Sequence, residues 1–145
     1  MIKELSNVKL NHNKVIINGH DSMVHIEGVC LEAALSFNEH YILLFVTCDC
    51  PFEEILNIYL MDSQRNLIVD QAIISQQYSP GLFTDLTIRS ENTLSFEFMI
   101  EGEWIIELLE TPKKSICNLF SSRFVKRPFS LFRYFNIVNR QKQCL

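Results

Sequence analysis

The chain has 145 residues, of which 48% are hydrophobic and 21% charged, and its formal net charge is −4. This length suits one domain with its own core, and the composition excludes a disordered or fibrous chain. No apolar run approaches the length of about 18 residues needed to span a bilayer. Residues 1–6 also lack the apolar stretch of a signal peptide. We therefore expect a single cytoplasmic domain.

Short strand signals recur through the first third of the chain. Residues 14–18 are predicted to form a strand that ends in a hairpin turn at Asn18-Gly19, because both turn residues tolerate positive φ. Residues 23–37 then contain one long strand or two short ones. The apolar run from Tyr41 to Val46 is continuous, which is typical of a central strand covered on both faces.

Two further hairpins are predicted in the middle of the chain. Segments 55–61 and 67–74 flank a short polar connector and are expected to pair. After a turn-rich loop at 76–81, apolar and polar residues alternate on either side of a turn at 101–103. The apolar positions are Leu94, Phe96, Phe98, Ile100, Trp104, Ile106 and Leu108. This alternation predicts an antiparallel sheet that is buried on one face and wet on the other.

The C-terminal segment differs in character from the rest of the chain. The apolar residues within 116–124 have the spacing of an amphipathic helix, and Pro128 is expected to break the helix. Residues 131–138 repeat the helical spacing, although a strand fits this aromatic run nearly as well.

These patterns together predict one mainly β (α+β) domain. Its core is expected over residues 7–110, as an antiparallel β-sandwich or a strongly curved sheet of about eight strands. Residues 111–145 are expected to form a basic, aromatic, partly helical segment packed on that core. The high number of Phe residues, eleven against four Gly and four Pro, also favours strands.

Charge is divided unevenly along the chain. Residues 1–110 carry seventeen acidic and five basic side chains, a net charge of −12. Residues 111–145 carry eight basic side chains and no acidic one, a net charge of +8. Three interpretations remain open. The basic segment folds back and cancels the acidic field, or an acidic face stays open to a basic partner, or the segment itself binds a polyanion.

The leading functional hypothesis is protein binding without catalysis, most concretely by an immunity- or inhibitor-like protein that neutralises a basic partner such as a toxin or nuclease. The contact is expected at wet acidic positions and nearby aromatic anchors, namely Glu97, Glu101, Glu103, Glu107, Tyr78 and Phe83. The alternative is peripheral binding of an anionic membrane or nucleic acid through Lys126, Arg127, Arg133 and Arg140.

No motif in the sequence requires a particular chemistry. Glycine-rich phosphate loops, a Gly-x-Ser-x-Gly elbow and a His-Glu-x-x-His helix are all absent. Cys48 and Cys50 can offer two thiolates to a metal, but no second pair completes the usual four zinc ligands. The adjacent Glu53 and Glu54 are interpreted as solvated surface charge, and the odd number of cysteines favours reduced thiols. We therefore expect no enzyme, no cofactor and no metal.

Overall fold

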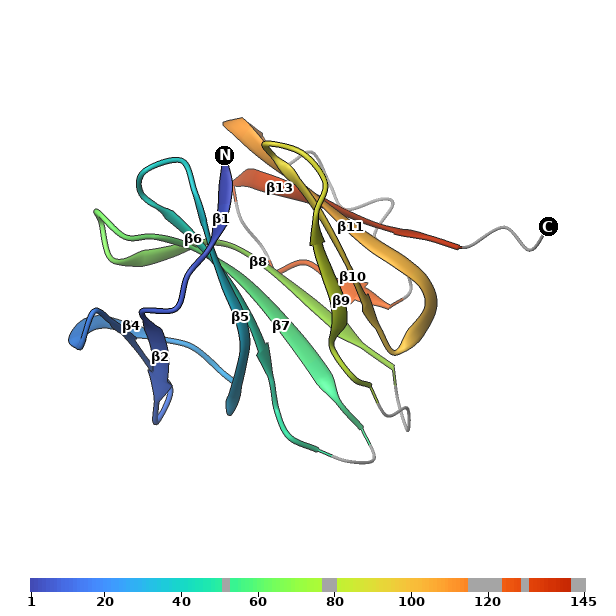
Figure 1. Ribbon diagram of the computed structural model, residues 1–145, viewed down its shortest axis with the longest axis horizontal. Coiled ribbons are helices and arrows are strands. Elements are labelled where there is room, and N and C mark those ends of the chain that lie inside the picture. Colours follow the sequence, from blue (N-terminus) through green and yellow to red (C-terminus); the bar gives the residue numbers. More distant parts are fainter. Residues whose placement is uncertain (51–52, 77–80, 115–123, 129–130, 142–145) are drawn as a thin grey trace.

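The computed structural model describes residues 1–50, 53–76, 81–114, 124–128 and 131–141, with the backbone alone for Ile100 and Glu101. Within these residues every regular element is a strand, and the strands form three antiparallel sheets (Figure 1). The mainly β, antiparallel prediction is therefore confirmed. The six-stranded sheet contains, in spatial order, β1 (Ile2–Glu4), β5 (Cys30–Phe37), β6 (Tyr41–Thr47), β7 (Ile55–Asp62), β8 (Leu67–Ser75) and β12 (Val125–Lys126).

The other two sheets cover the two faces of the six-stranded one. The four-stranded sheet has the order β13 (Phe132–Arg140), β11 (Ile100–Lys114), β10 (Thr93–Phe98) and β9 (Thr84–Ile88). The three-stranded sheet contains β2 (Val8–Asn11), β3 (Lys14–Ile17) and β4 (His20–His25). Figure 1 shows β2 and β4 on the opposite side of β5 and β7 from β9, β10 and β11.

The main core lies between the six-stranded and four-stranded sheets. Phe45 of β6, Phe96 of β10, Trp104 of β11 and Phe135 of β13 are all fully buried there. The rings of Phe45 and Phe96 meet edge to face, with their centroids 5.2 Å apart, a favourable aromatic geometry. These two sheets therefore form a β-sandwich.

A second core lies on the other face of the six-stranded sheet. Val15 and Val24 of the three-stranded sheet pack on Leu44 and Val46 of β6 and on Met61 of β7. Because both faces of β6 are covered, residues 42–47 are all buried. The prediction of a central strand at the continuous apolar run is confirmed.

The predicted hairpins are present. Asn18 and Gly19 both have positive φ, 52° and 77°, in the turn that joins β3 to β4. Strands β7 and β8 pair from Ile55↔Ser75 to Asp62↔Leu67. In the third hairpin Phe96 of β10 pairs with Trp104 of β11. Strand β11 already begins at Ile100, so the chain reverses before the predicted turn at 101–103.

The helical prediction for the C-terminal segment is not supported. Residues 131–138 fall almost entirely in strand β13, which pairs with β11 through Phe135↔Leu108 and Val138↔Ile105. Residues that face each other on paired strands point to the same side of the sheet, so Phe135 and Val138 point to opposite sides. The apolar residues of this segment therefore do not form one stripe, and their helical spacing is coincidental. The other helix was predicted within 116–124, of which only Phe124 is among the described residues. Strand β11 itself continues across the expected boundary at residue 110 to Lys114.

Candidate functional site

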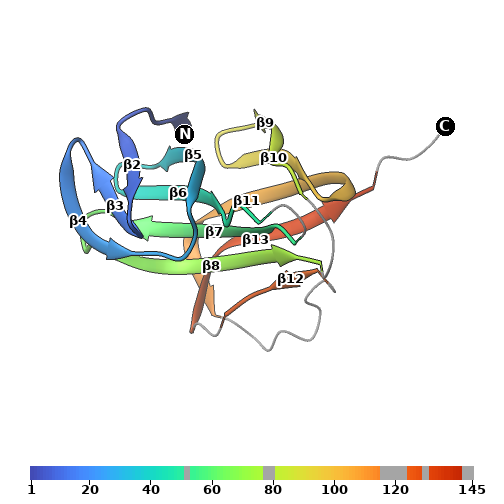
Figure 2. The same ribbon diagram turned by 90° about the horizontal axis from the view of Figure 1, so that it is seen from below.

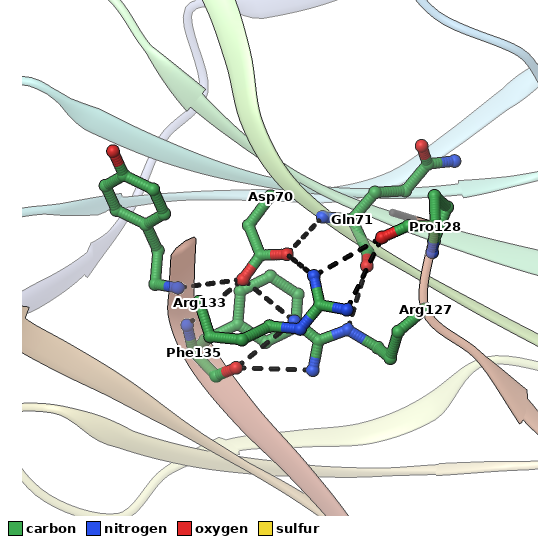
Figure 3. Close-up of polar contacts among 7 residues, drawn as sticks. Asp70, Gln71, Arg127, Pro128, Arg133 and Phe135 are labelled. Carbon is green, nitrogen blue, oxygen red and sulfur yellow. Dashed lines mark hydrogen bonds and ion pairs between the residues drawn. The ribbon is translucent and has the colours of Figure 1, made fainter. Parts of the chain in front are cut away.

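A buried ion network joins the C-terminal segment to β8 (Figure 3). Asp70 of β8 has a side chain that is 0% exposed, and its carboxylate contacts two guanidinium groups. Nη2 of Arg127 lies 2.8 Å from Oδ2, and Nη1 of Arg133 lies 3.2 Å from Oδ1. The side chains of the two arginines are only 9% and 12% exposed. Two cations of the basic segment therefore fold back on one carboxylate of the acidic region.

The same network closes one edge of the sandwich. Asp70 Oδ2 accepts a hydrogen bond from the Tyr134 amide at 2.8 Å, and Arg127 donates to the carbonyls of Phe135 and Gln71 at 3.3 Å and 2.9 Å. The Arg127 guanidinium also lies 4.4 Å from the centre of the Phe135 ring. Backbone groups at the edges of β8 and β13, which belong to different sheets, are thus satisfied by side chains instead of by a ladder.

The network brings opposite charges together in a buried position. Burial lowers the pKa of Arg127, and the charge and hydrogen bond of Asp70 oppose that shift. Arginine keeps its proton in proteins, so the cluster carries two cations and one anion. These contacts position the C-terminal segment against β8.

An open groove of about 680 Å³ lies beside the network. Tyr59 of β7 and Gln71 of β8 line it together with His25 of β4, Lys126 of β12 and Pro128. The Pro128 carbonyl accepts hydrogen bonds from Arg133 at 3.4 Å, and the Gln71 backbone is bound to Arg127 and Asp70. Figure 2 shows β12 beside β8 at the edge of the six-stranded sheet. The ion network therefore fixes part of the groove wall.

The chemistry of this groove is limited. The Tyr59 hydroxyl accepts from the Glu27 amide at 3.0 Å and donates to the Glu27 carbonyl at 3.1 Å. Burial raises the pKa of Tyr59, so the hydroxyl stays protonated and tied to the backbone. Both of these hydrogen bonds join the Tyr59 hydroxyl to backbone atoms of Glu27. Among the described residues that line the groove, no hydrogen bond between two ionisable side chains is present.

A buried carboxylate organises the turn between β6 and β7. Glu54 is only 9% exposed and accepts hydrogen bonds from the amides of Cys48 at 2.8 Å, Cys50 at 3.2 Å and Ile55 at 3.2 Å. The interpretation of Glu54 as solvated surface charge is therefore wrong, whereas Glu53 is exposed.

In the part of the chain that the structure describes, no three His, Cys, Asp or Glu side chains converge to hold a metal ion.

Three of the four predicted acidic positions, Glu97, Glu103 and Glu107, fall on the outer face of the four-stranded sheet. Glu103 and Glu107 alternate with the buried Trp104 and Ile106 along β11, and Glu97 lies on the neighbouring strand β10. Glu107 is exposed and Glu97 is half-buried. The backbone of Glu101 belongs to β11, and its side chain lies outside the described residues.

Glu103 already has a cationic partner on this face. Arg89 donates to its carboxylate and, through Nε, to the Ser95 hydroxyl. Hydrogen bonds from Ser95 and Arg89 lower the pKa of Glu103, and the charges of Arg89 and Arg140 add to the effect. Arg140 is the residue opposite Glu103 on β13. Part of the expected negative potential is therefore cancelled within the sheet.

The predicted aromatic anchors differ from the expectation. Phe83 is half-buried, and its ring packs on Phe45 and Phe96 with centroid distances of 5.0 Å and 5.3 Å. It packs against the main core and is not an exposed anchor. Tyr78 lies outside the described residues.

The four cations of the alternative hypothesis divide into two pairs. Lys126 and Arg140 are exposed, whereas Arg127 and Arg133 contact Asp70 inside the network. Sequence reasoning missed Asp70 altogether. The available signal was an acidic residue inside the otherwise strand-like run 67–74, where a buried charge needs a partner.

Comparison with known proteins gives no assignment. No protein-family model matches the sequence, and neither a curated protein nor a solved structure matches the chain. The described residues also include no helix able to cross a membrane.

Proposed function

We propose that this chain is a non-catalytic protein-binding domain, most concretely an immunity- or inhibitor-like protein that neutralises a basic partner such as a toxin or nuclease. The contact surface is the outer face of the four-stranded sheet. The observation that carries the proposal is the arrangement of Glu97, Glu103 and Glu107 around the apolar pair Ile105 and Val138.

Strand register supports a composite surface. Val138 of β13 lies opposite Ile105 of β11 and is 56% exposed, although it is a large apolar residue. On either side of this pair, Glu103 faces Arg140 and Glu107 faces Asn136. An apolar centre within a polar and charged rim is the usual anatomy of a protein interface.

The charges of this face are expected to orient a bound partner more than to raise the affinity for it. Among the described side chains, Glu97, Glu103 and Glu107 share this surface with the cations Arg89 and Arg140. A mixed rim of this kind steers and aligns a partner, while the apolar centre supplies the larger share of binding energy. We therefore expect the partner to place a basic side chain near Glu107, the exposed carboxylate.

The polyanion alternative has less support. Arg127 and Arg133 are held by Asp70, so of its four cations only Lys126 and Arg140 are exposed to a membrane or a nucleic acid. Non-specific polyanion binding rests on several simultaneous phosphate contacts. A face that carries glutamates beside Arg140 also opposes such binding.

Charge reversal and an apolar-centre substitution test the proposal on a partner captured with the full chain as bait. Glu107→Lys is expected to slow association about tenfold at low salt. Val138→Asp is expected to speed dissociation, because it places a charge in the apolar centre. Lys126→Glu, on a different sheet, is the matched control and should change neither rate. Unchanged rates for both Glu107→Lys and Val138→Asp would refute the proposed surface.

A further inference from the structure

The turn after β6 carries two cysteines that are two residues apart, Cys48 and Cys50. Cys50 is exposed and its thiol donates to the carbonyl oxygen of Cys48 at 3.7 Å, so the side chain folds back over the turn. Asp49 between them has a φ of 56°, which tightens the chain at this point. We propose that Cys48 and Cys50 are a redox-active thiol pair, which a low-molecular-weight disulfide such as glutathione disulfide closes into an intramolecular disulfide.

The backbone of this turn is organised before any reaction. The buried carboxylate of Glu54 binds the amides of both cysteines, at 2.8 Å and 3.2 Å, and so fixes their relative position. On the other side, the Asn57 side-chain amide lies 4.0 Å from Cys48 Sγ and is itself buried. A turn held in this way loses little conformational freedom when its two thiols are joined.

The exposure of the two thiols assigns their order of reaction. The exposed Cys50 thiolate attacks one sulfur of the small disulfide, whose S–S bond breaks and releases one thiolate with the bonding electron pair. The Cys48 thiolate then attacks the Cys50 sulfur and releases the second small thiolate. The two protons lost by the cysteines pass through solvent to these leaving groups. Two protein thiols are thus oxidised as one small disulfide is reduced to two thiols.

The environment of Cys48 fits a resolving role. Burial raises the pKa of Cys48, and the negative charge of Glu54 adds to the shift. A thiol that is poorly stabilised as a thiolate is a slow first nucleophile, and its reduced form gains no ionic stabilisation that would resist disulfide formation. The closing step should accordingly become faster as pH rises.

The experiment uses the reduced full chain in excess glutathione disulfide, followed by quenching with an alkylating reagent and peptide mass spectrometry. The tryptic peptide 15–65 contains Cys30, Cys48 and Cys50 and no other cysteine. Cys30 lies opposite Thr47 in the neighbouring strand and is the competing partner. The mass of the wild-type peptide is expected to show the loss of two hydrogen atoms relative to the reduced peptide, from the Cys48–Cys50 disulfide. It should also show the addition of one alkyl group, on the free thiol of Cys30.

Three variants make the assignment sharp. Cys30→Ser should still lose two hydrogen atoms and should retain no alkyl group. Cys48→Ser should accumulate a glutathione adduct on Cys50, because no resolving thiol remains, and Cys48→Ala should do the same. Three alkyl groups on the wild-type peptide, a stable glutathione adduct on wild-type Cys50, or two alkyl groups on Cys30→Ser would each overturn the proposal. None of these readouts depends on the proposed protein partner.

Discussion

Asp70 shows how one side chain can connect two sheets. Its fully buried carboxylate binds two guanidinium groups and backbone amides of both β8 and β13. The cost of removing water from such charges is large, so the arrangement is stable only while every partner is present. This makes the residue a sensitive point for mutation.

The substitution Asp70→Asn keeps the shape of the side chain and removes its charge. Arg127 and Arg133 then lose the buried carboxylate that both contact, and the free energy of unfolding should fall by about 3–5 kcal/mol. Urea denaturation followed by circular dichroism measures the change. Asp21→Asn is a matched control, since the Asp21–Lys14 pair is solvent-exposed and worth about 0–1 kcal/mol. Equal losses in the two variants would contradict the role given to the network.

At the scale of elements, the turn between β7 and β8 depends on a carboxylate. Asp62 accepts hydrogen bonds from the amides of Gln64 and Arg65 and from Nε of Arg65, at 3.0, 3.2 and 2.7 Å. Burial alone would raise the pKa of Asp62, but the hydrogen bonds from the Arg65 side chain and from the two amides outweigh it, and the pKa is lowered. The ionised carboxylate therefore stabilises the turn.

The pH dependence of stability follows from the direction of that shift. A group with a lowered pKa contributes stability above its unfolded value, about 3.9 for Asp, and the contribution is lost as pH falls through the lower folded value. Asp62→Asn should cost about 0.5–1 kcal/mol at neutral pH, because Arg65 is largely exposed. Denaturation curves between about pH 7 and pH 3 should show the difference from wild type fading at the acidic end. A difference that stays constant over this range would show that the charge of Asp62 is irrelevant.

Local sequence patterns predicted strands well where the buried residues follow the spacing of apolar residues along the chain. The apolar run from Tyr41 to Val46 and the alternation around Trp104 gave the correct strands, because side chains of a strand meet the two sides of its sheet in turn. The pattern failed at 131–138, where a helical spacing of apolar residues coincides with strand β13. The pairing with β11 determines which face of β13 is buried, and the local spacing of apolar residues does not encode that pairing.

The sites were harder to predict than the strands. The contact of Asp70 with Arg127 joins residues 57 positions apart, and no local spacing encodes it. Alternation placed Glu103 and Glu107 on the outer face of β11, yet the partner of Glu103 is Arg89, on the segment that precedes β10. Charge counts by segment could not show this neutralisation, because it depends on the register of adjacent strands.

At the scale of the whole molecule, the division of charge along the chain has a structural consequence. The basic C-terminal segment supplies an edge strand to each sheet of the sandwich, β12 to the six-stranded one and β13 to the four-stranded one. It also supplies the two cations that bind Asp70. The opposite charges of the two segments therefore meet at Asp70, and we expect the C-terminal segment to fold together with the rest of the chain.

A truncated chain of residues 1–114 tests this integration. The truncation removes the fully buried Phe135, the partner strand of β11 and both arginines of the network. Loss of a buried Phe alone costs about 3–5 kcal/mol. Added to the 3–5 kcal/mol expected for Asp70 without its partners, this approaches the whole stability of a typical domain, about 5–15 kcal/mol. We therefore expect the truncated chain to lose cooperative unfolding.

Trp104 reports the outcome directly, because it is the single tryptophan and is fully buried next to β13. Its fluorescence should shift to longer wavelength in the truncated chain without denaturant, as in the urea-unfolded full chain. The full-length variant Lys126→Gln, which changes one exposed cation of the segment, should keep the emission of a buried tryptophan and a cooperative transition. Cooperative unfolding and buried-type emission from residues 1–114 would show instead that the rest of the chain folds without the segment. This outcome would favour the alternative hypothesis, in which the cations of the segment bind a polyanion.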